Sequence, residues 1–131
     1  MVIDTSAPVA ILHGEPERRT FTEAIEGADS RLMSTASFIE ISIVIESRYG
    51  AEGLRDLDRF MRRSVIELVP VDVEQAHIAR GAFSRFGKGR HRSALNYGDC
   101  FSYAPSMVMG EPLLCKGDGF IHTDAVMVGT H

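Results

Sequence analysis

Hydrophobic and polar positions follow one another in blocks along this chain, and the first block is an apolar run that ends at an acid. Met1 to Ile3 suit a short buried strand, whereas Asp4 carries a charge that a buried parallel strand cannot hold in its middle. The apolar residues between Ala7 and Leu12 then indicate a helix. We therefore expect Asp4 at the carboxyl end of a strand, at the edge where open parallel sheets bind ligands.

The rest of the chain alternates short apolar runs with longer amphipathic stretches. Runs of apolar or β-branched residues predict strands at 31–34, 65–71, 112–116 and 125–128. Capping residues, glycine stops and apolar positions three or four apart predict helices at 16–26, 36–48, 51–63, 72–87 and 96–109. Gly50 should separate the two helices on either side of it. The inner face of the helix at 72–87 should carry Val73, Ala76, Ala79 and Phe83.

Strands that alternate with helices in this way form a parallel sheet with right-handed crossovers and helices on both faces. The sequence therefore predicts a three-layer α/β/α fold around a parallel sheet of about five short strands. A length of 131 residues suits a single domain, 1–131, with a core of its own.

The apolar runs and the cysteines indicate the cellular location of the protein. The longest apolar runs fall far short of the roughly 18 residues that a membrane-spanning helix needs, and the first residues enter the fold at once, so we expect neither a membrane span nor a signal peptide. Cys100 and Cys115 lie in apolar runs without C-x-x-C spacing. These features predict a reduced, cytoplasmic protein.

Basic residues gather in one segment of a chain whose net charge is −4. That net charge argues against a protein that coats nucleic acid non-specifically. The segment 80–92 nevertheless has no acid and contains Arg80, Arg85, Lys88, Arg90 and Arg92. Such a segment favours local contact with a phosphate-bearing partner. The alternative is a solvated helix end, because cations also favour helix C-termini.

Four acids can meet at the carboxyl edge of the predicted sheet. Asp4 and Asp118 each follow a strand, Asp99 falls in the first turn of a helix, and Glu40 lies in the helix after the second strand. Each has a structural explanation when it is taken singly, as a helix cap, a charge at a helix N-terminus or a turn residue. Their common position at one edge is what suggests a site.

The helix that contains Glu40 is apolar almost all round, so we expect it to be buried. A lone buried carboxylate is unfavourable by several kcal/mol unless it is protonated, paired or bound to a metal. Two carboxylates about 4 Å apart repel by about 4 kcal/mol at an effective dielectric constant of about 20, so a cluster of them needs a cation. Oxygen ligands without a nearby His or Cys set predict Mg²⁺ or Mn²⁺.

Four motifs follow one another in order: MVIDTSA at the start, a helix with Ser37 and Glu40, the run YGDCFSYA, and EPLLCKGDGF near the end. Together they resemble a PIN domain, and specifically a VapC-type toxin of a bacterial toxin–antitoxin pair. The resemblance spans essentially the whole chain, and the third and fourth motifs are its most specific part.

The resemblance implies an Mg²⁺- or Mn²⁺-dependent endoribonuclease that inhibits translation and growth unless a cognate VapB-type antitoxin neutralises it. Asp4, Glu40 and Asp99 would form the acidic triad, with Asp4 and Asp99 as the most direct metal ligands and Asp118 as a fourth acid. The antitoxin would lie in a groove of the early helices and reach these acids. The resemblance also implies a homodimer, an RNA substrate and no membrane.

These expectations together suggest a mechanism that gives roles to the remaining polar residues. The bound cation would activate water for attack on an RNA phosphodiester, with Glu40 orienting that water or completing the cluster. Thr5 or Ser6 could hydrogen-bond the phosphate or Asp4. The flanking phosphates of the RNA would contact Arg80, Arg85, Lys88, Arg90 and Arg92.

Two positions depart from the family pattern. The last acid of the family commonly stands directly before the Phe of the final turn, but here that place is Gly119 and the acid is Asp118. Pro105 lies inside the helix that begins near Asn96, where it removes a backbone hydrogen bond and should kink the helix. Asp99 precedes the proline by six residues, outside the expected kink.

Two other functions stay open on the residues alone. One is a receiver-type signalling domain that binds Mg²⁺, for which Lys116 is a poor match to the expected late lysine. The other is a non-catalytic interaction domain with a PIN-like fold. The aromatic residues Tyr97, Phe101 and Tyr103 could stack on bases or pack in the core or an interface. The scattered histidines predict surface or loop positions: His13, His77, His91, His122 and His131.

Overall fold

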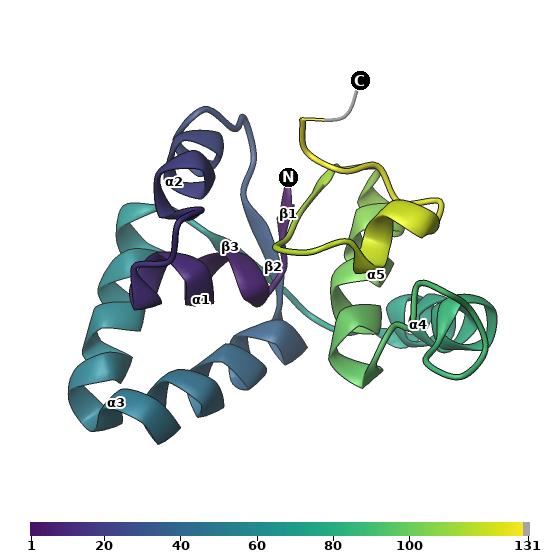
Figure 1. Ribbon diagram of the computed structural model, residues 1–131, viewed down its shortest axis with the longest axis horizontal. Coiled ribbons are helices and arrows are strands. Elements are labelled where there is room, and N and C mark those ends of the chain that lie inside the picture. The colour runs from purple at the N-terminus through teal and green to yellow at the C-terminus, as the bar shows by residue number, and fades with distance from the viewer. Residues whose placement is uncertain (130–131) are drawn as a thin grey trace.

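The computed structural model describes residues 1–129 of the chain and contains a four-stranded sheet (Figure 1). The strands lie in the order β3-β2-β1-β4, and all neighbours run parallel. They are β1 (Val2–Ile3), β2 (Leu32–Ser34), β3 (Glu67–Val69) and β4 (Leu113–Leu114). The predicted parallel sheet is confirmed.

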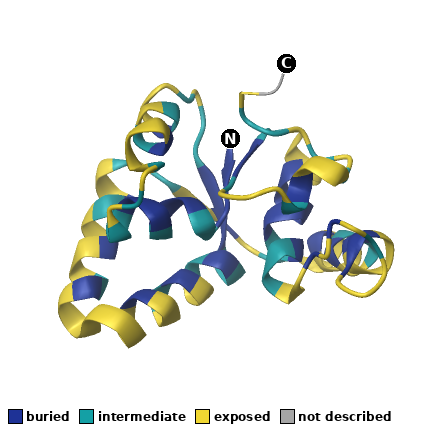
Figure 2. Cartoon of the chain, viewed as in Figure 1, coloured by how far each residue is buried: buried dark blue, intermediate teal, exposed yellow. Residues whose placement is uncertain are grey.

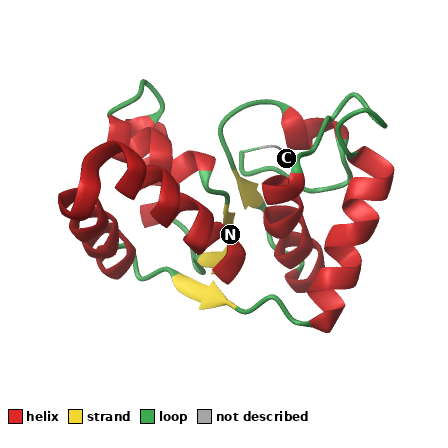
Figure 3. Cartoon of the chain, turned by 90° about the horizontal axis from the view of Figure 1, so that it is seen from below, coloured by secondary structure: helices red, strands yellow, loops and turns green. Residues whose placement is uncertain are grey.

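Helices cover both faces of this sheet, with α1, α2 and α3 on one side and α4 and α5 on the other (Figures 1 and 3). Their bounds are α1 (Ser6–His13), α2 (Arg18–Glu26), α3 (Thr35–Arg63), α4 (Val73–Phe86) and α5 (Tyr97–Met109), followed by the 3₁₀ helix η1 (Gly119–His122). This arrangement is the three-layer α/β/α fold that the sequence predicted. None of the described helices is long and apolar enough to cross a membrane.

The period of two along each strand divides the core into two clusters, one on each face of the sheet. One residue of each of β1, β2 and β4 packs among the helices α1 to α3: Ile3, Met33 and Leu114. Its neighbour packs among α4 and α5: Val2, Leu32 and Leu113. Because successive strand side chains point to opposite faces, these short apolar strands are buried on both sides.

The strand expected at 125–128 is only a single bridge in the structure, where Met127 pairs with Leu113. Two backbone hydrogen bonds make this pairing, from Leu113 N–H to the Val126 carbonyl at 2.8 Å and from Val128 N–H to the Leu113 carbonyl at 3.0 Å. The strand is so short because β4 itself has only two residues to pair with.

Gly50 divides α3, as predicted, into two helical stretches. Its φ of 70° and ψ of −157° are not helical, and this is the kink at which the chain changes direction. Pro105 does not break α5, which continues through it to Met109, and the proline is buried in the helix layer.

Two expectations about buried helix faces are wrong. The first half of α3 is not buried all round, since parts of it are exposed (Figure 2). Ile39 and Ile43 are each 59% exposed. Only one stripe of this half, which contains Ile41 and Ile45, reaches the core, because α3 forms an outer layer with one neighbouring layer.

The inner face of α4 is also rotated from the predicted one. The helix buries Gln75, Ala79, Ala82 and Phe86. Of the four residues expected inside, Ala79 alone is buried, while Val73 is 74% and Phe83 is 37% exposed. Small residues on the buried face let α4 lie against α5, and this packing determines which stripe of α4 points inward.

Replacing Gly50 by Ala should lower the free energy of unfolding by about 1 to 3 kcal/mol, because only glycine readily adopts its backbone conformation. Gly81→Ala is the matched control, since it lies within α4 and no atom would crowd the new Cβ. It should leave stability unchanged or raise it by up to about 1 kcal/mol. Urea unfolding measures both. Wild-type stability in Gly50→Ala would contradict this account of the kink.

Candidate active site

Asp4 lies at the carboxyl end of β1 and is 6% exposed. Its backbone N–H donates to the Leu114 carbonyl at 2.9 Å, which holds the residue beside β4. The carboxylate accepts a hydrogen bond at Oδ1 from the Ser102 hydroxyl at 2.5 Å. At Oδ2 it accepts two from Ser6, from the hydroxyl at 2.6 Å and from the backbone N–H at 3.1 Å. These donors make burial of the carboxylate tolerable, and the expected contact with Ser6 is present.

Glu40 lies on α3 across from Asp4, but it is exposed rather than buried. The expectation of a lone buried carboxylate is therefore wrong, because the side of α3 that carries Glu40 faces solvent. Its Oε1 accepts a hydrogen bond from the Thr5 hydroxyl at 2.8 Å. A Cβ at position 98 would collide with the Glu40 carboxylate, so Gly98 is what lets Glu40 approach the first turn of α5.

Asp99 stands in that first turn and takes part in a capping box. Its backbone N–H donates to Asn96 Oδ1 at 2.8 Å, and its Oδ2 accepts from the Asn96 backbone N–H at 2.9 Å. The pKa of Asp99 is raised, chiefly because burial disfavours its charged form. The negative charges of Asp4 and Glu40 raise it further, against the lowering effect of the Asn96 backbone bond. Asp4 and Glu40 are therefore each close enough to Asp99 to repel its negative charge.

Asp118 lies at the rim of this group, exposed in the turn after β4. Its negative charge acts on Cys115. Burial raises the pKa of that thiol to about 12, together with the negative charges of Asp4, Asp99 and Asp118. The thiol thus lies within the field of three of the four predicted acids. The structure brings Asp4, Glu40 and Asp99 together and leaves Asp118 more loosely associated.

The chemistry of these donors fits a divalent cation. Among the described residues, no group of three or more His, Cys, Asp or Glu side chains is placed so that it could hold a metal ion. Mg²⁺, however, usually keeps several waters and binds through one or two carboxylates. Asp99 accepts the capping hydrogen bond at Oδ2, so Oδ1 is the oxygen that could bind a cation. Oxygen donors with mutually repelling charges suit a hydrated Mg²⁺ or Mn²⁺ between Asp4 and Asp99.

The predicted cations lie on the second half of α4 and in the loop that follows it, and none of them forms an ion pair with the four acids in the described structure. Arg85 bonds Asp124 at 3.1 Å, and its guanidinium lies 4.6 Å from the ring centre of Phe86. Arg90 lies 5.6 Å from the ring centre of Phe83. The other three are exposed: Arg80, Lys88 and Arg92.

Hydrogen bonds within the chain order the basic segment between α4 and α5. Lys88 N–H donates to the Leu95 carbonyl at 2.9 Å, and Leu95 N–H donates to the Phe86 carbonyl at 3.0 Å. His91 bonds Ser93 at 2.9 Å and has its ring against Phe86. The cations are therefore displayed on an ordered loop.

The other histidines and the aromatic residues have surface or packing positions. His13 bonds the Tyr49 hydroxyl at 2.7 Å, His77 and His122 are exposed, and His131 lies outside the described residues. Tyr103 is buried and donates its hydroxyl to Asp124 at 2.6 Å, so it cannot stack on a base. Tyr97 and Phe101 lie nearer the surface, edge to face with ring centres 4.8 Å apart.

Sequence reasoning missed Ser102, which contacts Asp4 from α5. Its hydroxyl also lies 3.5 Å from that of Ser37 on α3, and both serines are almost fully buried. The available signal was the spacing, because Ser102 follows Asp99 by three residues and so projects from a neighbouring part of the same helix face.

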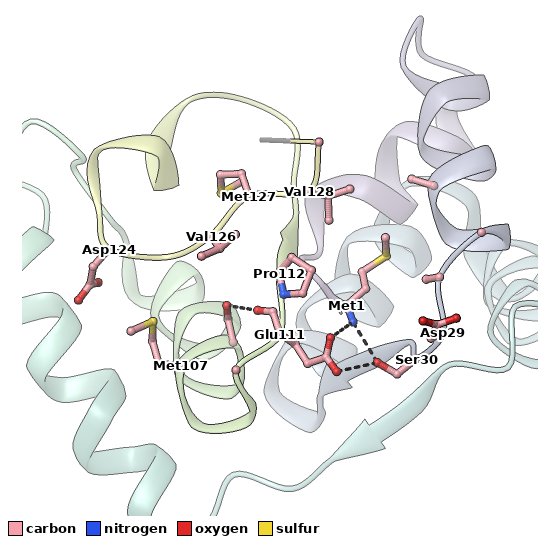
Figure 4. A pocket seen from close by; sticks show the side chains of 16 residues that line it. Met1, Asp29, Ser30, Met107, Glu111, Pro112, Asp124, Val126, Met127 and Val128 are labelled. Carbon is pink, nitrogen blue, oxygen red and sulfur yellow. Dashed lines mark hydrogen bonds and ion pairs between the residues drawn. The ribbon is translucent and has the colours of Figure 1, made fainter. Parts of the chain in front are cut away.

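A hollow of about 860 Å³ lies at the opposite, amino end of the strands (Figure 4). The Met1 amine there donates to Glu111 at 2.6 Å and to Ser30 at 3.0 Å. Ser30 also bonds Glu111, so these three groups bond one another, and none of the four predicted acids lines the hollow.

Comparison with known proteins places this geometry among PIN domains. The PIN domain profile matches residues 1–126. Ribonuclease VapC of Mycolicibacterium smegmatis is 55% identical over 128 residues, which cover 98% of this chain and 99% of that protein.

Two solved structures share the fold at lower identity. The Mycobacterium tuberculosis toxin VapC20, described as cleaving the sarcin–ricin loop, superimposes with a TM-score of 0.78 and 16% identity over 97% of both chains. A chain of a toxin–antitoxin complex from Klebsiella pneumoniae gives a TM-score of 0.71 and 15% identity over 96% of this chain and 94% of its own.

The raised pKa of Asp99 predicts that Asp99→Asn stabilises the metal-free fold at neutral pH. At low pH the Asp99 carboxyl is protonated in both the folded and unfolded states, so the variant should gain little. In the unfolded wild type the pKa of Asp99 is about 3.9, whereas in the folded protein it is raised. As the pH rises above about 3.9, Asp99 therefore ionises more readily in the unfolded state, and the wild type loses stability that the variant keeps.

Urea unfolding in EDTA at pH 3.5 and at pH 7 measures this difference. Asp58→Asn, at an exposed acid on α3, is the control and should show no such pH-dependent gain. A variant that is less stable than wild type at pH 7 would show that the capping role of Asp99 outweighs the repulsion.

Proposed function

This chain belongs to the PIN domain family, among its VapC ribonucleases, and we propose that it is the toxin of a toxin–antitoxin pair. As such it is an endoribonuclease that cuts RNA and inhibits translation and growth unless its antitoxin neutralises it. The observation that carries this proposal is the meeting of Asp4, Glu40 and Asp99 at the carboxyl edge of the sheet, where Asp4 and Glu40 raise the pKa of Asp99. We also propose a cytoplasmic location, which an RNA substrate supports.

The proposed cofactor is Mg²⁺ or Mn²⁺, held by Asp4 and Asp99 with Glu40 beside them. When bound, such a cation activates water for phosphodiester hydrolysis and offsets negative charge on the scissile phosphate. The Asn96 cap holds Asp99 at the start of α5, and the Thr5 hydroxyl holds one oxygen of Glu40. The exposed side of Glu40 is then free to orient a water molecule towards the RNA. Asp118 is proposed as a more distant acid of the same site.

The ordered basic loop is the proposed contact for RNA phosphates flanking the cut. Lys88, Arg90 and Arg92 are exposed on this loop, and Arg80 is exposed on α4 before it, beside the hollow that Phe83 and Tyr97 line. Arg85 is a weaker candidate than the sequence suggested, because Asp124 already holds its guanidinium.

An exposed apolar strip on α3 supports a protein partner beside the acids. Ile39 and Ile43 are each 59% exposed and Val44 is 39% exposed, and all three are within a turn or so of Glu40. We assign this strip to the VapB-type antitoxin, whose apolar residues would cover it while another part of the same segment reaches Glu40.

A second exposed apolar surface, between α4 and α5, supports the proposed homodimer. Phe83, Tyr97 and Phe101 line a hollow of about 420 Å³ there, with Ala76 and Arg80. Tyr97 is 78% exposed. Burying such a surface against a second copy would remove its apolar area from water.

Cleavage of an RNA pool by the purified protein, with Mg²⁺, with Mn²⁺ and with EDTA, tests the proposed activity. Asp4→Asn and Asp99→Asn should each lower the rate more than about 100-fold, since even indirect partners of metal ligands contribute 10- to 100-fold. Glu46→Gln, at an exposed acid later on the helix of Glu40, should cut normally.

Two results would overturn this proposal. Metal-independent cutting would remove the assigned role of the acids. A folded wild-type protein that neither binds Mn²⁺ nor cuts RNA would instead be a non-catalytic PIN-like interaction domain.

Phe83→Glu should convert the dimer to a monomer, because it places a charge in the apolar surface between α4 and α5. Sedimentation velocity of the metal-free protein measures the change. Ile121→Glu is the control, since Ile121 is 52% exposed on η1, outside that surface, and should leave the dimer intact. A wild-type protein that sediments as a monomer at high concentration would refute the dimer.

A further inference from the structure

The two oxygens of the Asp4 carboxylate are held in different ways. A carboxylate oxygen has about two lone-pair positions for hydrogen bonds or metal ions. Oδ2 accepts two hydrogen bonds from Ser6, at 2.6 and 3.1 Å, so both of its positions are used. Oδ1 accepts one, from the Ser102 hydroxyl at 2.5 Å. Oδ1 is therefore the oxygen with a position left for a cation.

The two sets of donors also come from different parts of the fold. Ser6 begins α1 two residues after Asp4, and its hydroxyl is itself held by the Lys116 backbone N–H at 2.9 Å. Ser102 is 98 residues away along the chain, on α5 in the opposite helix layer. The hydrogen bond at Oδ1 thus joins the two layers at the acidic site, whereas the bonds at Oδ2 are local.

Burial restricts the hydrogen-bond partners of the Ser102 hydroxyl. Its residue is 1% exposed, so solvent does not compete for the hydroxyl proton. That proton goes to Asp4, and Ser37, 3.5 Å away and 2% exposed, is then the donor in the contact between the two serines. A hydroxyl fixed from both sides holds Oδ1 in one direction.

We propose that Ser102 is a positioning residue of the acidic site, which sets the direction in which Oδ1 of Asp4 meets the divalent cation. This inference rests on the proposed metal-dependent function. It assigns α5 two tasks, because the helix contributes Asp99 as one ligand and orients Asp4, the other, through Ser102. Without that hydroxyl, Asp4 keeps its bonds to Ser6 but its second oxygen is free to turn away.

Binding of Mn²⁺ alone, followed by electron paramagnetic resonance without RNA, tests the inference. Ser102→Ala should weaken Mn²⁺ binding by about 10- to 100-fold, the usual effect of removing a hydrogen bond to a metal ligand. In RNA cleavage the same variant should need correspondingly more Mn²⁺, and saturating metal should restore much of its rate. Asp99→Asn should not be restored in this way.

Ser106→Ala is the matched control for a structural effect. Ser106 lies one turn further along α5, is 3% exposed, and donates at 2.6 Å to the Glu111 carbonyl at the other end of the sheet. It should lose stability in urea as Ser102→Ala does but keep the wild-type affinity for Mn²⁺. Equal weakening of Mn²⁺ binding in both variants would mean that Ser102 acts only through stability.

The outcomes separate this inference from the proposed function. Wild-type affinity in Ser102→Ala, with a wild-type protein that binds Mn²⁺ and cuts RNA, would overturn the role of Ser102 and leave the nuclease in place. A wild-type protein that neither binds Mn²⁺ nor cuts RNA would overturn both.

Discussion

The burial of the Asp4 carboxylate at the end of β1 is the constraint on which the rest of the structure depends. A buried carboxylate is strongly unfavourable unless donors surround it. Ser6 supplies two hydrogen bonds from α1 and Ser102 supplies one from α5. The bonds from Ser6 are local, but the bond from Ser102 forms only when the sheet edge and both helix layers meet at one point. The condition that makes Asp4 tolerable in the fold is therefore also the condition that assembles the acids.

The acidic site lowers the stability of the metal-free fold, although the proposed function depends on it. Asp99 satisfies the start of α5 through its capping box with Asn96, yet burial and the charges of Asp4 and Glu40 raise its pKa. A site that repels its own charges binds a cation more strongly than one whose acids are already paired. In the proposed ribonuclease, the repulsion between these acids would thus lower the stability of the metal-free fold and strengthen the binding of the cation.

The two apolar surfaces on α3 and α4 show what the sequence pattern could not predict, namely whether an apolar residue is buried or exposed. Ile39, Ile43 and Phe83 look like core residues in a sequence, because apolar residues that bind a partner and apolar residues that fill a core have the same periodicity. In the structure they face outward. The errors in the predicted buried faces therefore coincide with the surfaces that we assign to the antitoxin and to a second copy of the chain.

Local chemistry explains what the sequence by itself determined. The end of β1 at Asp4, the cap at Asn96 and the break at Gly50 each depend on neighbouring residues, and so do the approximate positions of the three acids. The tertiary structure alone decided the length of the last strand, the exposed faces of α3 and α4, and the bond from Ser102 to Asp4. These depend on how much surface each helix finds to pack against and on contacts between residues as far as 98 positions apart. The spacing of Ser102 from Asp99 indicates a shared helix face, but it does not identify Asp4 as the partner of Ser102.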